Sequence, residues 1–455
     1  MSSPIPPDLS AAFDSTPAMR TVFSDRARVQ RMLDVEAALA RAQVQSGIIP
    51  ALALAAINAV CDADQMDFSA LAQAAPLAGN LAIPLVKQLT ARVAAVDAEA
   101  AKYVHWGATS QDIIDTGLVL QLRDACTHIE ADLLQLGDVL AQMAEQYRDT
   151  PQVGRTWMQQ ALPITFGLKV AGWLDGLHRH RTRITGAKAQ LSVLQFGGAT
   201  GTLASLGNQG LQVATALAAE LKLTLPDMPW HAQRDRFGEL AATLGLLVGS
   251  LGKMARDISL LSQTEIAELA EPVAPGRGGS STLPHKRNPV ACAATLAAAV
   301  RVPGLVGTML SAMVQENERA LGGWQAEWEC LPQIVQLAAA ALQHMLQAVT
   351  GLQIDTDKMR ANLDLTDGQI MAEAVTLALA EKLGRLAAHE LVERACHRAV
   401  ASRQHLRAVL AQDPDVNSIL TADDFDSVFN PADYTGLATQ FVDRVVQTWR
   451  KETQR

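Results

Sequence analysis

Apolar residues recur at helical spacing through most of the chain, and few stretches alternate apolar and polar residues as a strand would. Five amphipathic stretches follow one another through the middle of the sequence. They cover residues 112–147, 163–194, 235–268, 289–318 and 325–350. A helix of about 35 residues spans roughly 50 Å, because each residue adds 1.5 Å. The pattern therefore predicts an all-α protein built around an elongated bundle of long helices.

The two ends of the chain carry shorter helical patterns. Near the start, residues 29–46 form a strong helical pattern that Gly47 is placed to end. The last hundred residues contain another set of short helices. We therefore expect an N-terminal helical domain (1–110), a central long-helix bundle (111–351) and a C-terminal helical domain (352–455).

The composition supports a helical fold and narrows the range of partners. Hydrophobic residues make up 49% of the chain but aromatic residues only 4%, so small side chains such as alanine must provide much of the packing. Sheets rely more on aromatic and β-branched residues, which makes a β-sandwich or a barrel a poor match. The net charge of −9, without clustered lysines or arginines, disfavours nucleic acid and acidic membranes as partners.

Neither the cysteines nor the uncharged stretches indicate secretion or a membrane span. The five cysteines lie far apart without C-x-x-C spacing, which predicts free thiols in a reducing compartment and no zinc site. The chain starts without the charged and apolar regions of a signal peptide. Two runs without charged residues, 189–219 and 330–354, carry glycines or a stripe of glutamines, which suit a loop and a bundle helix. We therefore expect a cytoplasmic protein with no membrane partner.

The strongest candidate for chemistry is the loop 278–289, which leads into the helical stretch that follows it. Its glycines allow backbone N–H groups to approach a ligand closely. The Ser280 hydroxyl can donate or accept a proton, Lys286 supplies a positive charge, and Asn288 offers both amide donors and a carbonyl acceptor. A helix N-terminus also favours an anion, so the loop suits a negatively charged substrate. A polar surface loop before a helix is the simpler alternative.

Two further polar segments lie at boundaries of the long helices. The first, residues 105–112, holds two hydroxyls and an amide where a long helix begins, and N-capping alone would also explain it. The second, residues 154–160, is predicted to be a bend between two long helices. Its Arg155 can hold a carboxylate in a bidentate fork, although a surface arginine in an inter-helix turn is an equal alternative.

These three segments resemble the signature regions of one enzyme family. Residues 279–289 match the signature loop of the fumarase/aspartase superfamily, G-S-S-x-x-P-x-K-x-N-P, at every specified position. Residues 105–116 and 154–160 resemble that family's first and second regions. The resemblance implies a three-domain α-helical protomer, a homotetramer whose core is the central bundle 111–351, and active sites that are each built from three subunits. Segments at opposite ends of helices of roughly 50 Å cannot meet within one bundle, whereas antiparallel neighbours could bring them together.

Within the superfamily, four segments are similar to the bacterial 3-carboxy-cis,cis-muconate cycloisomerases. They are residues 104–112, 154–157, 230–236 and 326–329. Fumarases and adenylosuccinate lyases carry a histidine where this chain has Trp157, and adenylosuccinate lyases carry another near the position of Asn80. An indole cannot shuttle a proton near neutral pH as an imidazole does. The change suits a reaction whose leaving group is already a stable carboxylate.

The resemblance implies cycloisomerisation of a small tricarboxylate substrate, with no metal and no other cofactor. Ser280 is carried over as the group that transfers a proton, and Lys286 as the group that stabilises an oxyanion. The remaining candidates are expected to bind carboxylates or to shape the pocket. They are His105, Thr109, Ser110, Gln111, Arg155, Trp157, Gln159, Asn288 and Arg319. For His105, simple packing is an equal alternative.

Two other functions remain open. A lyase of the same superfamily that acts on a succinyl-amine, such as adenylosuccinate, would release fumarate, but the missing histidines disfavour it. A non-catalytic helical scaffold, as in the lens crystallins of this superfamily, is the alternative outside enzymes. Such a scaffold would be expected to tolerate the loss of Ser280 or Lys286, and this chain retains both.

Overall fold

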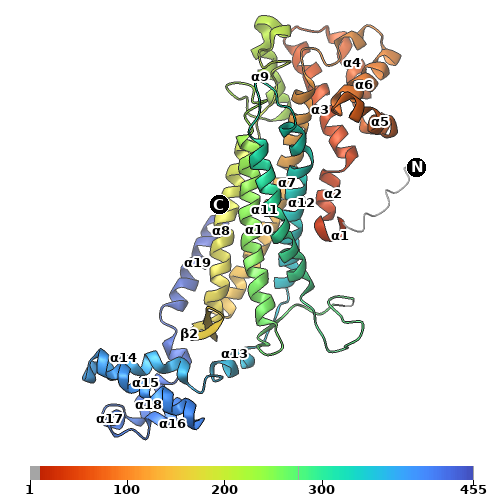
Figure 1. The fold of residues 1–455 in the computed structure, drawn as a ribbon. Helices are drawn as coiled ribbons and strands as arrows, with labels where there is room; N and C mark the ends of the chain where they lie inside the picture. The colour runs from red at the N-terminus through yellow and green to blue at the C-terminus, as the bar shows by residue number, and fades with distance from the viewer. Residues whose placement is uncertain (1–10, 275, 454–455) are drawn as a thin grey trace. The chain divides into compact units, whose positions relative to one another are not determined.

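Helices account for most of the chain in the computed structural model, which describes residues 11–274 and 276–453 (Figure 1). The chain divides into two compact units. The first comprises the described residues up to 132, 180–251 and 294–343, and the second comprises 133–179, 252–293 and the described residues from 344 onward. Each unit is assembled from separate stretches of chain, because five long helices contribute residues to both.

These five long helices confirm the predicted all-α fold. They are α7 (Ser110–Gln146), α8 (Phe166–Leu191), α10 (Asp235–Leu261), α11 (Val290–Ala312) and α12 (Gly323–Val349). Two of them end earlier than the apolar pattern predicts. After α10 the backbone turns at Ala267, which has a φ of 52°, and after α11 it turns at Asn317, which has a φ of 50°. A left-handed residue cannot belong to a right-handed helix, so neither helix can extend to the predicted ends at 268 and 318.

The first unit also contains a cluster of shorter helices near the N-terminus. They are α1 (Ala11–Asp14), α2 (Pro17–Val22), α3 (Asp25–Gln45), α4 (Ala51–Val60), α5 (Phe68–Ala78), α6 (Ala82–Val96) and α9 (Gly210–Leu221). Helix α3 begins after Ser24, whose hydroxyl accepts a hydrogen bond from the Ala27 N–H. Its buried face includes Val29, Met32 and Leu33, as the sequence pattern indicates. One turn further along, the same face carries the buried carboxylate of Glu36.

Segment 154–160, predicted to be a bend between two long helices, belongs to a β-hairpin that joins α7 to α8. Strand β1 (Pro151–Thr156) pairs antiparallel with β2 (Gln159–Thr165), and the register runs from Pro151 opposite Thr165 to Thr156 opposite Gln159. The two-residue turn consists of Trp157 and Met158, with φ values of 52° and 64°. Such turns favour Asn and Gly because both central residues are left-handed, so a Trp-Met turn gave no recognisable signal in the sequence.

The rest of the second unit consists of short helices and one further pair of strands. The helices are α13 (Thr356–Leu363), α14 (Ala372–Leu383), α15 (Arg385–Ser402), α16 (Leu406–Leu410), α17 (Pro414–Asn417), α18 (Ala422–Val428) and α19 (Ala438–Thr453). Strands β3 (Leu269–Ala270) and β4 (Gln353–Ile354) pair antiparallel. An apolar core that includes Val375, Leu391 and Leu410 joins α14, α15 and α16.

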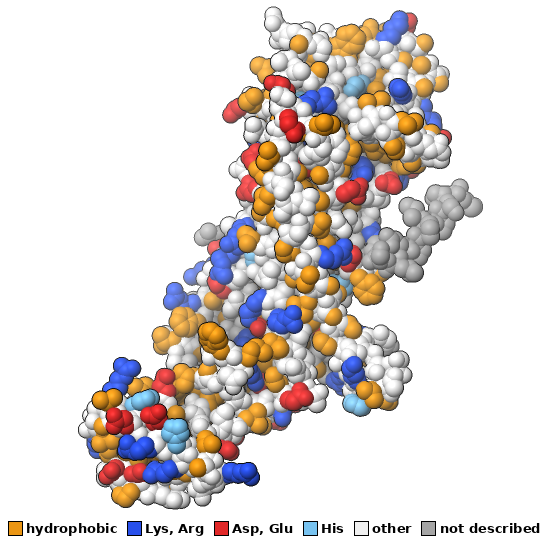
Figure 2. Space-filling model, viewed as in Figure 1, with side chains coloured by type: hydrophobic (Ala, Val, Ile, Leu, Met, Phe, Trp, Pro, Cys, Tyr) orange, Lys and Arg blue, Asp and Glu red, His pale blue; other side chains and the backbone are white. Residues whose placement is uncertain are grey.

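Helix α11 exposes an unusual amount of apolar surface. By length and composition it could cross a membrane, yet only 28% of its most apolar window is buried. Val300 is 81% exposed and Leu310 is 49% exposed, while added Cβ atoms at Gly304 and Gly307 would meet nothing within 4 Å. Figure 2 shows hydrophobic side chains spread along the helices of this face. A helix that is apolar around most of its circumference normally lies buried, so this surface requires a covering element.

Candidate active site

In the first unit, the predicted binding residues gather at the turn that precedes α7. Arg319 donates a hydrogen bond from Nη1 to the Thr109 hydroxyl over 2.7 Å, and its Nε lies 3.3 Å from Gln111 Oε1. The Gln111 amide also donates to the His231 carbonyl oxygen over 2.9 Å and is fully buried. Ser110 is the first residue of α7 and only half-buried. The structure therefore places Thr109, Gln111 and Arg319 in direct contact, with the Ser110 hydroxyl beside them in the chain.

The carboxylate of Asp112, which is 1% exposed, connects this turn by hydrogen bonds to the loops that carry Gly197 and His231. Asp112 accepts hydrogen bonds from the backbone N–H groups of Thr109, Gly197 and Gly198, at 3.0, 3.0 and 2.9 Å. His231 Nε2 lies 2.7 Å from Asp112 Oδ1. A Cβ at Gly197 would meet Pro229 at 2.7 Å, so only glycine allows this close approach. Asp112 thus sets the position of the turn that carries Thr109 and Ser110, a role that goes beyond N-capping alone.

A second buried network lies one helical turn further along α7. The guanidinium of Arg234, 1% exposed, forms bidentate contacts with Asp115 (2.7 and 3.1 Å) and with Glu327. Trp324 Nε1 donates to Asp115 over 2.9 Å. Burial raises the pKa of Glu327 despite the opposing effect of Arg234. The Arg234 guanidinium compensates the carboxylates of both Asp115 on α7 and Glu327 on α12. The network therefore fixes the start of α12, and with it the preceding segment that carries Arg319, relative to α7.

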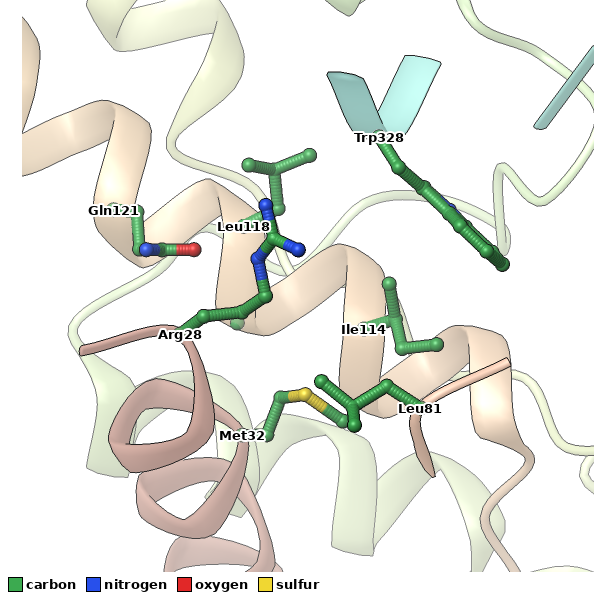
Figure 3. Close-up of a pocket in the computed structure, with 8 residues that line it drawn as sticks. Arg28, Met32, Leu81, Ile114, Leu118, Gln121 and Trp328 are labelled. Atoms are coloured by element: carbon green, nitrogen blue, oxygen red, sulfur yellow. The ribbon is translucent and has the colours of Figure 1, made fainter. Parts of the chain in front are cut away.

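A small pocket continues along the same face of α7 as Ser110. Ile114, Leu118 and Gln121 follow Ser110 at helical spacing, and they line a cavity of about 60 Å³ together with residues from other helices (Figure 3). Those residues include Arg28 and Met32 from α3, Leu81 from the start of α6 and Trp328 from α12. The cavity is apolar except for the Arg28 guanidinium and the Gln121 amide, so it offers an apolar wall next to the polar turn.

In the second unit, the signature loop forms a closed excursion of the backbone. The Asn288 N–H donates to the Gly278 carbonyl oxygen over 2.9 Å, and Gly279 forms a β-bridge with Arg287. Gly278 has a φ of 66°, and a Cβ there would meet the Asn288 carbonyl oxygen at 2.6 Å. The loop, including Lys286 and Asn288, lines a cavity of about 1270 Å³, and residues of strands β3 and β4 line the same cavity. The base of the loop is therefore fixed, while its tip faces open space.

The two predicted catalytic residues both lie toward the tip of this loop, where Lys286 is exposed and Ser280 is half-buried. Ser280 Oγ accepts hydrogen bonds from the backbone N–H groups of Thr282 and Leu283, at 3.2 and 3.0 Å. Two donors at Oγ favour negative charge on that oxygen. Among the described residues, Lys286 Nζ forms no hydrogen bond or ion pair. Both groups are therefore available to a ligand that approaches from outside the second unit.

The N-terminus of α11 already binds the carboxylate of Glu271. The sequence predicts that this helix end suits an anionic substrate. Glu271, 8% exposed, accepts hydrogen bonds from the N–H groups of Ala291 and Cys292, at 3.2 and 2.9 Å. Arg277 donates to the same carboxylate over 3.1 Å. The prediction that this helix end suits an anion is met by a side chain of the protein, because a nearby carboxylate supplies the charge that the helix dipole favours.

Arg155 is also engaged by a carboxylate of its own unit. Its guanidinium contacts Glu268 at 2.6 and 3.3 Å, and Glu268 is fully buried. The side-chain amides of Gln152 and Asn362 donate to the same carboxylate over 2.7 and 2.8 Å. This network attaches the β1–β2 hairpin to α13. Beyond it, the hairpin tip presents Trp157, 98% exposed, and Gln159 at its edge.

The structure therefore separates the predicted residues into two groups. His105, Thr109, Ser110, Gln111 and Arg319 lie in the first unit, and Arg155, Trp157, Gln159, Ser280, Lys286 and Asn288 lie in the second. Sequence reasoning missed the buried polar side chains that support them: Asp115, His231, Arg234, Glu268, Glu327 and Glu36. Several of these stand in the segments 230–236 and 326–329, whose density of polar residues among apolar ones is the signal that could have identified them.

Comparison with known proteins now places the chain. Residues 12–304 match a family model described as lyase. The chain belongs to this lyase family, the fumarase/aspartase superfamily. Residues 368–445 match a second model, described as adenylosuccinate lyase C-terminus.

Members of the superfamily resemble this chain over nearly its whole length. A 3-carboxy-cis,cis-muconate cycloisomerase of Pseudomonas aeruginosa is 56% identical, over 94% of this chain and 93% of the relative. That of Bradyrhizobium diazoefficiens is 50% identical, over 99% of this chain and 100% of the relative. The crystal structure of 3-carboxy-cis,cis-muconate lactonizing enzyme from Pseudomonas putida superposes with a TM-score of 0.94 at 53% identity, covering 98% of this chain and 99% of that one.

Proposed function

We propose that this chain is a cycloisomerase that interconverts 3-carboxy-cis,cis-muconate and 4-carboxymuconolactone, a step in the degradation of aromatic compounds. The observation that carries the proposal is the 56% identity to a cycloisomerase over 94% of the chain. The site supports it, because Trp157 stands where other superfamily branches use a histidine. Ring closure within one substrate molecule needs no protonated leaving group, so the absence of an imidazole there is no handicap.

The chemistry requires one proton transfer and stabilisation of negative charge. One carboxylate of the substrate adds to the conjugated double bond, so a C–O bond forms and the displaced electrons move onto a neighbouring carboxylate. A proton then reaches the α-carbon. We assign that proton to Ser280, whose Oγ already accepts two backbone hydrogen bonds that would stabilise an alkoxide. Lys286 would stabilise the same charge or that of the dianion. Enforced proximity of the reacting groups supplies much of the rate.

The other residues would hold the three carboxylates. Thr109, Ser110 and Arg319 offer donors from the first unit, and Asn288 and Gln159 offer donors from the second. Arg155 already binds Glu268, and Gln111 already donates to Asp115 and His231, so their contribution would be to position the hairpin and the turn. Trp157 would close the pocket against water. Because non-glycine residues in left-handed conformations cluster at functional sites, the strained Trp157–Met158 turn fits such a role.

We further propose a cytoplasmic homotetramer whose active sites combine residues from three subunits. The exposed apolar face of α11 supports this, since packing against the same helix of other copies would bury Val300 and Leu310. Such packing would also let the Thr109 turn of one copy meet the loop of another. The three-domain division at residues 110 and 351 remains a prediction within this proposal.

The test is an absorbance assay that follows loss of the muconate diene, with the lactone identified by mass and NMR. Wild-type protein should consume 3-carboxy-cis,cis-muconate, and adenylosuccinate should release no fumarate. Fumarate release would favour the succinyl-amine lyase, a possibility that the C-terminal match at residues 368–445 keeps worth testing. Failure to turn over either substrate would leave the non-catalytic scaffold.

Ser280→Ala should lower turnover at least about a hundredfold, because it removes the proton-transfer group. Ser280 is only half-buried and its hydroxyl accepts hydrogen bonds from backbone N–H groups of its own loop, so the variant should keep the oligomeric state and the thermal midpoint of the wild type. Ser281→Ala, at the neighbouring exposed serine, is the matched control. A Ser280→Ala variant with near-normal turnover would remove this residue from the mechanism.

A further inference from the structure

The buried carboxylate of Glu36 has His105 as its direct partner. Glu36 is 2% exposed and belongs to the apolar face of α3. His105 Nδ1 lies 2.6 Å from Glu36 Oε1, and no other hydrogen bond of Glu36 occurs among the described residues. A buried carboxylate is stable only when it is compensated, so the imidazole next to it must carry much of that compensation.

The backbone around His105 is held in a strained form. His105 has a φ of 60°, a left-handed value that costs a residue with a Cβ about 1–3 kcal/mol. Gln43 lies two turns after Glu36 on α3 and donates to the Trp106 carbonyl oxygen over 2.5 Å. Gly107 follows with a φ of 77°, where a Cβ would meet Leu206 at 2.7 Å. The turn is therefore clamped from α3 on one side and from Asp112 on the other.

The charges that face His105 are all acidic. Burial lowers the pKa of His105, but the attraction and hydrogen bond of Glu36 outweigh it, and Asp112 on α7 adds a smaller contribution. The net effect raises the pKa above its ordinary value of 6.5. Asp112 itself is already satisfied by His231 and three backbone N–H groups. Glu36 is therefore the main group that keeps a proton on His105.

We propose that Glu36 is a positioning residue that makes His105 a hydrogen-bond donor to one carboxylate of the substrate. This inference rests on the proposed function. Glu36 fixes the ring through Nδ1–H, which leaves Nε2 on the opposite edge of the ring. Nε2 has no partner among the described residues, and 20% of the side chain is exposed. His105 stands on the same turn as Thr109 and Ser110.

The protonation state of His105 decides whether its Nε2 donates or accepts a hydrogen bond. In the imidazolium form both ring nitrogens donate, so Nε2–H can bind a carboxylate. When the ring loses a proton, Nδ1–H stays with Glu36 and Nε2 becomes an acceptor, which repels a carboxylate. His105 thus converts from donor to acceptor as the pH rises. Glu36 moves that change to a higher pH and keeps the donor form in place near neutrality.

The direct test is the pH profile of the Glu36→Gln variant, which keeps a hydrogen-bond acceptor but removes the charge. We expect KM for 3-carboxy-cis,cis-muconate at pH 7 to rise about tenfold or more, with kcat changed much less, in line with the loss of one charge-assisted hydrogen bond. The fall of kcat/KM with rising pH should start at a lower pH than in the wild type. Glu99→Gln removes an exposed charge from a nearby segment and should keep the wild-type profile.

Two further measurements separate this role from a structural one. In a His105→Gln background, Glu36→Gln should add little to the rise in KM, because the carboxylate acts through the ring. Full additivity, an unshifted pH profile or a loss confined to kcat would overturn the proposal. If Glu36→Gln does not fold, NMR titration of His105 in the wild type decides, since a pKa at or below 6.5 contradicts the role of Glu36. That titration can be read even if the muconate is not the substrate, so the two proposals fail separately.

Discussion

The Asp112–Asp115–Arg234 region of the first unit and the signature loop of the second differ in how their polar groups are buried and hydrogen-bonded. In the first region nearly every polar atom is buried and paired, and Arg234 alone joins two carboxylates. In the loop, the backbone is paired at the base and Ser280 Oγ accepts hydrogen bonds from two backbone N–H groups, while the Lys286 side chain stays exposed. Within the proposed function, this difference corresponds to two roles: the buried region would hold the substrate carboxylates in a preorganised site, and the loop would supply the reactive group.

The buried region should be the one that fails most severely when a charge is removed. Arg234→Met leaves Asp115 and Glu327 buried without their cation, so the free energy of unfolding should fall by about 3–5 kcal/mol. Denaturant unfolding followed by circular dichroism measures this loss. As a control, Arg26→Met breaks an exposed ion pair with Asp64 and should change stability little. If both variants unfold alike, the Arg234 network does not organise the first unit.

The loop should respond in activity and barely in stability. Gly278→Ala forces a Cβ onto the Asn288 carbonyl oxygen at a left-handed φ, which strains the loop base by about 1–3 kcal/mol. We expect kcat/KM to fall by about tenfold or more, since each 1.4 kcal/mol corresponds to a factor of ten. The midpoint of thermal unfolding should stay close to that of the wild type.

A matched control lies at the next residue. A Cβ at Gly279 meets nothing within 4 Å, and its φ is not left-handed, so Gly279→Ala should cause a clearly smaller loss of activity. Equal losses in the two variants would show that the loop is sensitive to any side chain there, and that the fixed base seen at Gly278 does not matter.

The same contrast explains what could be predicted from the sequence. The long helices and the three polar segments were predictable, because helical periodicity and motif spacing are local properties of the chain. The hairpin was not, because its turn uses Trp157 and Met158 where a sequence signal needs Asn or Gly. The buried partners also escaped prediction. Glu36 sits one turn after Leu33 on an apolar face, and only the fold shows that His105 meets it there.

The smallest expected effect concerns stability against pH in the first unit. The folded-state pKa of His105 is raised, so its proton stabilises the folded form below the ordinary value of 6.5, and this contribution is lost as pH rises through the folded value. Glu36→Gln should therefore destabilise the protein by about 1–2 kcal/mol near pH 6, the range of a charge-assisted hydrogen bond, and by less at pH 8. Denaturant unfolding of both proteins at several pH values measures the difference. A gap that stays constant or widens toward pH 8 would mean that Glu36 stabilises the fold by packing, and that the preorganised site does not depend on the charge of His105.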